Sequence, residues 1–193
     1  MQEVVINSAD GHQYTWIDIV GPTRDELNAL AAVYGLHQLM VRDCLDPLHL
    51  PKYERYEDWS FIILRSFDPE AEDQASSVRR LTRKLAVFVS TKYIITIHRT
   101  DQLYIKNLRE YWRNKATTSS AHTVFHPLNH ILQSAVQSYD QALEKCRSDL
   151  DKVEAKTFLR NERPSLEGES AYRLIRKTTV IRPVSYTHLR AHE

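Results

Sequence analysis

The sequence contains few of the residues from which disulfide frameworks, glycine-rich loops and membrane spans are built. It has two cysteines and four glycines in 193 residues, and none of its apolar runs approaches the ~18 residues needed to cross a bilayer. Cys44 and Cys146 lie far apart in apolar patterns, which favours two buried thiols in a reducing compartment over a disulfide. No signal-peptide pattern opens the chain. These absences predict a soluble polypeptide.

The charge balance and the motif content argue against two further classes of function. The chain carries 26 Lys and Arg against 25 Asp and Glu, a net charge of +1, so no overall field favours nucleic acid. It also has no glycine-rich phosphate loop, no nucleophile beside an obvious base and no pair of titratable groups at motif spacing. We therefore expect neither a nucleic-acid-binding protein nor an enzyme.

What the first third of the sequence does contain is a strand, strand, helix pattern. Residues 4–6 and 14–20 predict two strands joined by a hairpin. Thr23 and Glu26 then form a capping-box pattern that opens a helix, and Gly35 ends it. Both faces of the second strand are largely apolar, which is typical of a sheet that helices cover.

A short helix follows and leads into the most apolar strand of the chain. Pro47 and Pro51 prevent the helix from continuing. Residues 59–64, a run of aromatic and β-branched side chains, predict a strand buried on both faces. Two further strands are predicted at residues 77–90 and 93–98, followed by a helix that begins near Asp101.

The last third of the sequence predicts a long helix. Pro127 stands in its first turn, where proline is tolerated best, and apolar residues then recur at spacings of 3 and 4 for about seven turns. Such a length predicts packing against a partner helix. The expected divisions are an α/β domain over 1–120, a helical arm over 121–164, the start of a further helix over 165–184 and a non-native tail over 185–193.

Several segments of the chain together carry a family resemblance. Residues 45–64 read LDPLHLPKYERYEDWSFIIL, in which a short helix ending in an acidic residue precedes a Pro-Lys-x-Glu-x-Tyr stretch and a hydrophobic strand. Trp16-Ile-Asp, the strand within residues 85–97 and Pro127 before a long helix agree in order and spacing. In this order, residues 12–183 resemble the cytoplasmic domain of CorA-type magnesium and cobalt transporters.

The resemblance implies an α/β/α layered domain with a largely antiparallel or mixed sheet and a helical arm, assembled as a homopentamer on the cytoplasmic face of the inner membrane. It also implies that residues 165–184 begin a stalk helix leading to two transmembrane helices and a Gly-Met-Asn signature, none of which this sequence contains. The chain would then be a regulatory domain that senses ions and holds the assembly together without conducting ions. Its membrane contact would lie in the missing segments.

Ion sensing in this family implies carboxylates at contacts between neighbouring subunits, since Mg²⁺ prefers oxygen ligands. The acidic loop, which we define as Asp68, Glu70, Glu72 and Asp73, falls where the family has one such carboxylate. A regulatory Mg²⁺ site is therefore expected there, with Co²⁺ or Zn²⁺ as other possible ions. The competing interpretation is a solvated connection between two strands.

Other acidic and histidine residues are interpreted structurally. The acidic residues of the long helix alternate with basic ones and predict i,i+4 pairs on a wet face; they are Asp140, Glu144, Asp149, Asp151 and Glu154. His122, His126 and His130 are spaced by four residues, as a zinc site could be, but Pro127 interrupts the series and favours surface or capping roles. His98, Trp16 and Trp59 are expected in the core, and Asp43 and Asp46 as capping or turn carboxylates.

Two alternative functions remain open at this point. One is a zinc-transporting branch of the same superfamily, which shares the fold and differs in the ion carried. The other is a free-standing α/β interaction module that uses its helical arm to dimerise.

Overall fold

The chain folds into two compact units. In the computed structural model, the described residues are 1–7, 13–72, 75, 77–115 and 123–159. The first unit consists of Met1–Arg65 and Lys84–Ser134, and the second of Ser66–Arg83 and Ala135–Glu193. None of the helices within the described residues combines the length and apolar character that a membrane span requires.

The sheet is mixed and has six strands in the order β1-β2-β6-β5-β4-β3. β2 pairs antiparallel with β1 and parallel with β6, while β5 with β6 and β3 with β4 are antiparallel pairs. The strands are β1 (Gln2–Asn7), β2 (Gln13–Val20), β3 (Lys52–Tyr56), β4 (Trp59–Phe67), β5 (Thr82–Val89) and β6 (Tyr93–His98).

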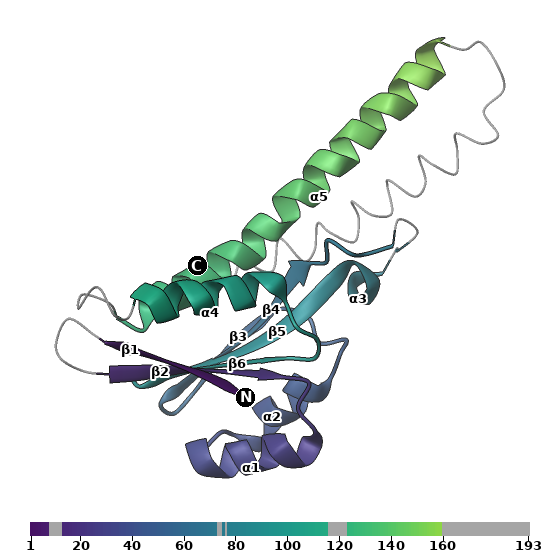
Figure 1. Cartoon of the computed structure of the whole chain (residues 1–193). Helices are drawn as coiled ribbons and strands as arrows, with labels where there is room; N and C mark the ends of the chain where they lie inside the picture. Colours follow the sequence, from purple (N-terminus) through teal and green to yellow (C-terminus); the bar gives the residue numbers. More distant parts are fainter. Residues whose placement is uncertain (8–12, 73–74, 76, 116–122, 160–193) are drawn as a thin grey trace. The chain divides into compact units, whose positions relative to one another are not determined.

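Helices cover both faces of this sheet in the first unit. Figure 1 shows α1 (Arg24–Tyr34) and α2 (Gln38–Leu45) on one face and α4 (Leu103–Lys115) on the other. Neighbouring residues of β2 are accordingly buried on opposite faces, with Trp16 0% and Ile17 1% exposed. The predicted α/β/α layering is thereby confirmed.

The local signals at α1 are confirmed in atomic detail. The Thr23 backbone N–H donates to Glu26 Oε2 at 2.7 Å, and the Glu26 N–H donates to Thr23 Oγ1 at 3.2 Å, so the capping box is complete. Gly35 adopts φ 67°, a left-handed conformation that glycine reaches without a Cβ penalty. Leu27 and Leu30 then face the core between the sheet and the two helices.

Two local expectations were wrong. Residues 77–90 form a short helix, α3 (Val78–Leu81), before β5 starts, because the Ser77 hydroxyl accepts the Arg80 N–H and caps a helical turn. β3 was not expected as a strand at all. It is an edge strand with four of its five residues exposed, so its sequence lacks the apolar alternation that reveals a half-buried strand.

The second unit contains most of the long helix α5 (Phe125–Leu159), which confirms a long helix with Pro127 in its first turn. At 35 residues the helix is longer than the apolar pattern of about seven turns. Tyr139 and Ala142 form a small core with Phe67 and Val78. Three further expectations lie outside the described residues and stay predictions: the divisions near residues 120 and 164, the further helix over 165–184 and the tail over 185–193.

Candidate functional site

The acidic loop follows β4 in the second unit, and its described carboxylates do not converge. The Asp68 side chain is 11% exposed, lies 2.7 Å from Arg83 Nε, and accepts the Glu70 N–H at 3.2 Å. Glu72 is exposed and lies 3.7 Å from Arg80. The Glu70 side chain is also exposed, and Asp73 lies outside the described residues. Arginine side chains therefore already neutralise part of this loop.

Within the part of the chain that the structure describes, no three His, Cys, Asp or Glu side chains are placed to hold a metal ion together. A divalent-cation site at the acidic loop would therefore need further ligands, such as water and side chains of a neighbouring subunit. The Mg²⁺ assignment of the loop stays a prediction.

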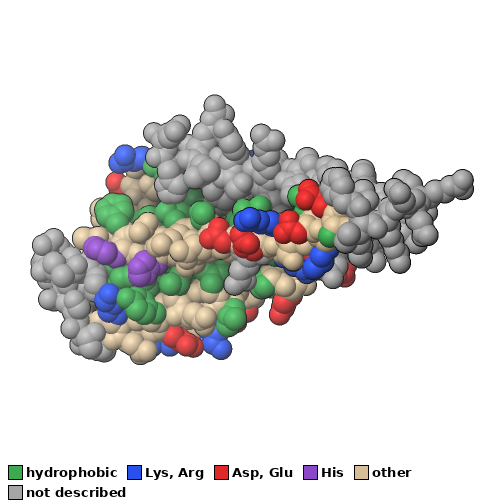
Figure 2. Space-filling model, turned by 90° about the horizontal axis from the view of Figure 1, so that it is seen from above, with side chains coloured by type: hydrophobic (Ala, Val, Ile, Leu, Met, Phe, Trp, Pro, Cys, Tyr) green, Lys and Arg blue, Asp and Glu red, His purple; other side chains and the backbone are tan. Residues whose placement is uncertain are grey.

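The other acidic and histidine candidates that the structure describes each contact a different set of groups. On α5, Asp149 pairs with Lys152 at 3.0 Å, an i,i+3 spacing where i,i+4 pairs were expected. The His126 imidazole accepts the Thr123 N–H at 3.1 Å at the start of α5, which agrees with a capping role. His130 instead packs against the rings of Tyr111 and Trp112, and Figure 2 shows histidine side chains beside exposed hydrophobic ones. His122 lies outside the described residues.

A buried ionic network that sequence reasoning missed lies between the sheet and α4. Asp18 of β2 pairs with His98 of β6, 2.9 Å from its Nε2, and with the Arg109 guanidinium of α4. The side chains of Asp18 and His98 are 0% exposed. The Thr96 hydroxyl donates to the same Asp18 oxygen and accepts the Trp16 indole N–H. We call these five residues the Asp18 network.

Both ring nitrogens of His98 face groups that only accept hydrogen bonds. Nε2 faces the Asp18 carboxylate, and Nδ1 lies 2.7 Å from the Thr100 carbonyl oxygen. Both nitrogens must therefore donate, which requires the imidazolium form. Burial lowers the pKa of His98, but the hydrogen bond and charge of Asp18 outweigh it and raise the pKa overall. Similarly, burial raises the pKa of Asp18, but His98, Thr96 and Arg109 lower it overall.

The raised pKa of His98 predicts a pH-dependent stability. The contribution of protonated His98 to the stability of the fold is complete below the unfolded-state pKa of 6.5. This contribution is lost as the pH rises through the higher folded-state pKa. We therefore expect His98→Gln to lower the free energy of unfolding more at about pH 5.5 than at about pH 8.5. Urea unfolding at each pH measures this difference. His126→Gln, on the surface, serves as control, and a pH-independent cost of His98→Gln would contradict the expectation.

The second arrangement that the sequence did not reveal lies at the end of α2. The Lys84 ammonium, from β5, donates to the backbone carbonyl oxygens of Asp43, Cys44 and Asp46 at 2.5–2.8 Å. Burial lowers the pKa of Lys84 to about 8, so the ammonium form still dominates at neutral pH. A tethered cation thus satisfies carbonyls that the end of a helix leaves without partners.

A second cation, which unlike Lys84 is fully buried, holds the next residues of the α2–β3 loop (residues 46–51). Arg65, 2% exposed, donates to the carbonyl oxygens of Pro47 and His49 at 3.2 and 2.9 Å. The Asp46 side chain accepts the Leu48 N–H at 2.9 Å, which confirms Asp46 as a turn carboxylate. The Arg65 side chain therefore fastens the loop to the sheet through the backbone carbonyl oxygens of the loop.

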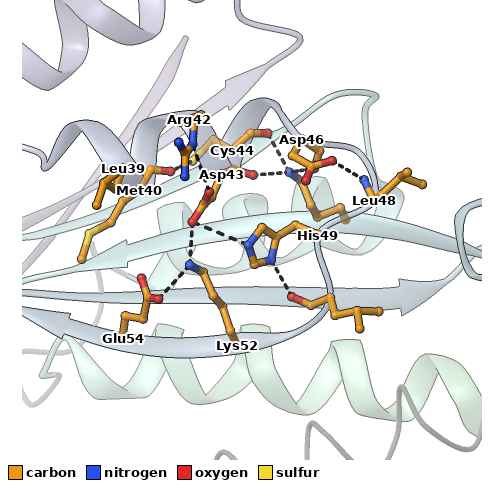
Figure 3. Close-up of polar contacts among 12 residues, drawn as sticks. Leu39, Met40, Arg42, Asp43, Cys44, Asp46, Leu48, His49, Lys52 and Glu54 are labelled. Atoms are coloured by element: carbon orange, nitrogen blue, oxygen red, sulfur yellow. Dashed lines mark hydrogen bonds and ion pairs between the residues drawn. The ribbon is translucent and has the colours of Figure 1, made fainter.

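Asp43 behaves differently from the expected capping carboxylate. Figure 3 shows its side chain directed toward Lys52 and His49. Lys52 Nζ lies 2.6 Å from Asp43 Oδ2 and 2.9 Å from Glu54 Oε1, and His49 Nε2 lies 3.6 Å from the same Asp43 oxygen. Asp43 is therefore an ion-pair partner that ties α2 to β3.

One signal could have revealed both arrangements. Arg65 interrupts the apolar run of β4, Lys84 precedes that of β5, and Asp18 lies between apolar residues in β2. Charged residues are rarely buried without partners, so a charge inside a strand buried on both faces implies a specific counter-group.

The comparisons with known proteins agree with this fold. The family model described as CorA-like Mg²⁺ transporter protein matches residues 11–190, nearly the whole of the 193-residue sequence. The chain belongs to this family. The resemblance found in the sequence is therefore confirmed, and the CorA-like family is one of divalent-cation transporters rather than enzymes.

Two curated relatives carry the same family name. The chain is 25% identical to the cobalt/magnesium transport protein CorA of Thermotoga maritima over 169 residues, which cover 86% of this chain and 46% of that protein. It is also 25% identical to CorA of Methanocaldococcus jannaschii over 165 residues, 83% of this chain and 49% of that one. The chain thus spans about half the length of these relatives.

Solved CorA structures share the fold. The complete CorA magnesium transporter of Methanocaldococcus jannaschii matches with a TM-score of 0.73 at 20% identity, over 97% of this chain and 60% of that one. The soluble domain of the same CorA matches with a TM-score of 0.61 at 19% identity, over 95% and 77%. The ZntB cytoplasmic domain of Vibrio parahaemolyticus matches with a TM-score of 0.55 at 11% identity, over 93% and 85%. These matches confirm the predicted fold class.

Proposed function

We propose that this chain is the cytoplasmic regulatory part of a CorA-type magnesium and cobalt transporter. The observation that carries the proposal is the family match over residues 11–190 on a chain about half as long as its relatives. In this role the chain senses divalent cations and holds neighbouring subunits of a homopentamer together. The remaining half of the transporter supplies the pore.

The acidic loop is the sensing element in this proposal. Hydrated Mg²⁺ bridges loop carboxylates to oxygen ligands of a neighbouring subunit, and its loss leaves like charges facing one another. Asp68 is held by Arg83 at 2.7 Å, so Mg²⁺ must compete with a tethered guanidinium for this carboxylate. Mg²⁺ shifts the equilibrium between closed and open assemblies only by its difference in affinity for the two states.

A zinc-transporting member of the superfamily is the second candidate, which the likeness to the ZntB cytoplasmic domain supports. It is the weaker candidate because the CorA match has the higher TM-score, 0.73 against 0.55. Measuring which ion the complete gene product transports in vesicles separates these two candidates.

A free-standing interaction module is the third candidate function. The genomic sequence after codon 184 distinguishes it from a transporter. Two apolar segments of ~20 residues with a Gly-Met-Asn signature would support the transporter, and a stop codon would contradict it.

We expect neutralising the acidic loop to weaken Mg²⁺ protection of the complete gene product against proteolysis. Changing Asp68 and Asp73 to Asn, and Glu70 and Glu72 to Gln, removes the anionic ligands without changing their shape. The Mg²⁺ concentration for half-maximal protection should rise at least about tenfold, within the usual range of coupling between two sites. Limited trypsin digestion across a Mg²⁺ titration, read on gels, measures it.

The matched control neutralises carboxylates elsewhere on the surface. Glu144→Gln with Asp151→Asn, both exposed on α5, should leave the Mg²⁺ titration unchanged. Arg83→Gln removes the competing guanidinium and should shift the titration to lower Mg²⁺. An unchanged titration in the loop variant would remove the acidic loop from the mechanism and leave the family assignment intact.

A further inference from the structure

Three backbone carbonyl groups at the end of α2 converge on one point. The carbonyl oxygens of Asp43, Cys44 and Asp46 lie 2.7, 2.8 and 2.5 Å from the Nζ atom of Lys84. Figure 3 shows these three residues following one another at the end of α2. We call the three oxygens the carbonyl cradle. Rings of backbone carbonyl oxygens replace the hydration shell of K⁺ in channels, so the carbonyl cradle has the ligands of a cation site.

The charges around the carbonyl cradle also favour a cation. The last carbonyl groups of a helix carry a partial negative charge. The negative charges of Asp46 and Asp43 favour a positive charge at the position of Lys84 Nζ, and the guanidinium of Arg65 opposes it. Two carboxylates and a helix end therefore act against one cationic side chain, and the carbonyl cradle attracts positive charge.

The size of the carbonyl cradle indicates which class of cation fits. Mg²⁺ requires oxygen ligands at ~2.0–2.1 Å and gives up its water reluctantly, and Ca²⁺ takes about 6–8 oxygens. The three distances of 2.5–2.8 Å are too long for Mg²⁺, and three oxygens are too few for Ca²⁺. They suit an ammonium group, which the Lys84 side chain supplies. Free NH₄⁺ has the same head group, and K⁺ is of similar size.

We infer that the carbonyl cradle is a monovalent-cation site, which Lys84 fills with its own ammonium group. Because the side chain is tethered to β5, its ammonium group is present at a high effective concentration and excludes free ions. Without this side chain, NH₄⁺ or K⁺ binds the three oxygens and holds the start of the α2–β3 loop in its place. The inference concerns neither the acidic loop nor a divalent cation, and it does not depend on the transport proposal.

Removing the Lys84 side chain opens the carbonyl cradle and tests the inference. Hydrogen exchange of the Leu48 N–H, which Asp46 holds, reports on the loop. In Lys84→Ala, this amide should exchange at least about fivefold more slowly in about 0.4 M NH₄Cl or KCl than in choline chloride, whose cation is too large for the carbonyl cradle. A fivefold change at this concentration corresponds to a Kd of about 0.1 M. Lys84→Ser leaves similar space and keeps one donor, so it carries the test if the alanine variant does not fold.

Two controls keep the carbonyl cradle closed to ions. In the unchanged chain the ammonium group fills it, and in Lys84→Met an uncharged side chain of similar length fills the space. Both should show equal exchange of the Leu48 N–H in the three salts. Crystals of the small-side-chain variant grown with RbCl should show Rb⁺, a heavier stand-in for K⁺, in contact with the three carbonyl oxygens.

Three results would overturn the inference. Equal exchange in the three salts for the small-side-chain variant would show that the carbonyl groups accept only the tethered ammonium group. Rb⁺ bound elsewhere, with none at the carbonyl cradle, would show that the ion acts at another place. An equally large effect of NH₄⁺ or K⁺ on Lys84→Met would show the same, because that side chain leaves no room for an ion.

Discussion

Replacing Asp18 with asparagine is expected to lower the free energy of unfolding by about 3–5 kcal/mol, the usual cost of removing one partner from a buried ion pair. The Asp18 carboxylate is 0% exposed and faces both His98 and Arg109. Asparagine keeps the shape but removes the charge, so two cationic side chains remain buried without a counter-ion. Urea unfolding followed by circular dichroism measures the loss, a large share of the 5–15 kcal/mol typical of a domain.

Glu110→Gln is the matched control for this substitution. Glu110 lies beside Arg109 on α4 but is exposed, so its amide variant should change stability by no more than about 0.5 kcal/mol. In addition, Asp18→Asn combined with Arg109→Met should cost less than the sum of the two single changes by about 1–3 kcal/mol, because the pair is removed together. Additive costs would contradict the coupling inferred from the structure.

Lys84→Met is the second substitution with a large expected effect. Methionine has a similar length but no donor, so the carbonyl oxygens of Asp43, Cys44 and Asp46 lose their shared partner. Each buried acceptor left without a hydrogen bond costs about 1–3 kcal/mol. Since some of these carbonyls can reach water, we expect a total loss of about 3 kcal/mol in the free energy of unfolding, measured by urea unfolding.

Hydrogen exchange locates the effect of Lys84→Met. Amides of the α2–β3 loop, including the Leu48 N–H held by Asp46, should exchange at least about tenfold faster, while β2 and β6 keep their protection. Lys92→Met, the same change at an exposed turn position, should leave both stability and exchange unaltered. Unchanged loop exchange in Lys84→Met would mean that the loop holds its conformation without the ammonium.

Some features of this fold are readable from sequence because neighbouring residues determine them. Each of three features depends on a few consecutive residues: the capping box of Thr23 and Glu26, the left-handed Gly35, and Pro127 in the first turn of α5. The strongly apolar strands β4 and β6 are equally easy to predict, because a strand buried on both faces consists mostly of apolar residues. The sequence did not predict the edge strand β3, because its residues are exposed and show no apolar pattern. It did not predict α3, because this short helix depends on a single serine cap.

The site residues divide in the same way. The acidic loop is visible as a run of carboxylates, but whether they bind an ion depends on groups that approach them in space, of which this chain shows Arg83 and Arg80. His98 was expected in the core and is there, 2% exposed. Its charged state was not predictable, because it depends on Asp18, eighty positions earlier in the chain.

The sequence by itself determined the family, the α/β/α class and the order of most strands and helices. Local conformational preferences and apolar periodicity, which are properties of consecutive residues, were sufficient for the order of the elements. The family and the α/β/α class followed from the resemblance of residues 12–183 to CorA-type transporters. Only the tertiary structure decided that Asp18, His98 and Arg109 meet under α4 and that Lys84 and Arg65 fasten the α2–β3 loop. The reason is physical: a buried charge needs a partner, but the sequence does not show which of many distant groups the fold brings within hydrogen-bonding distance.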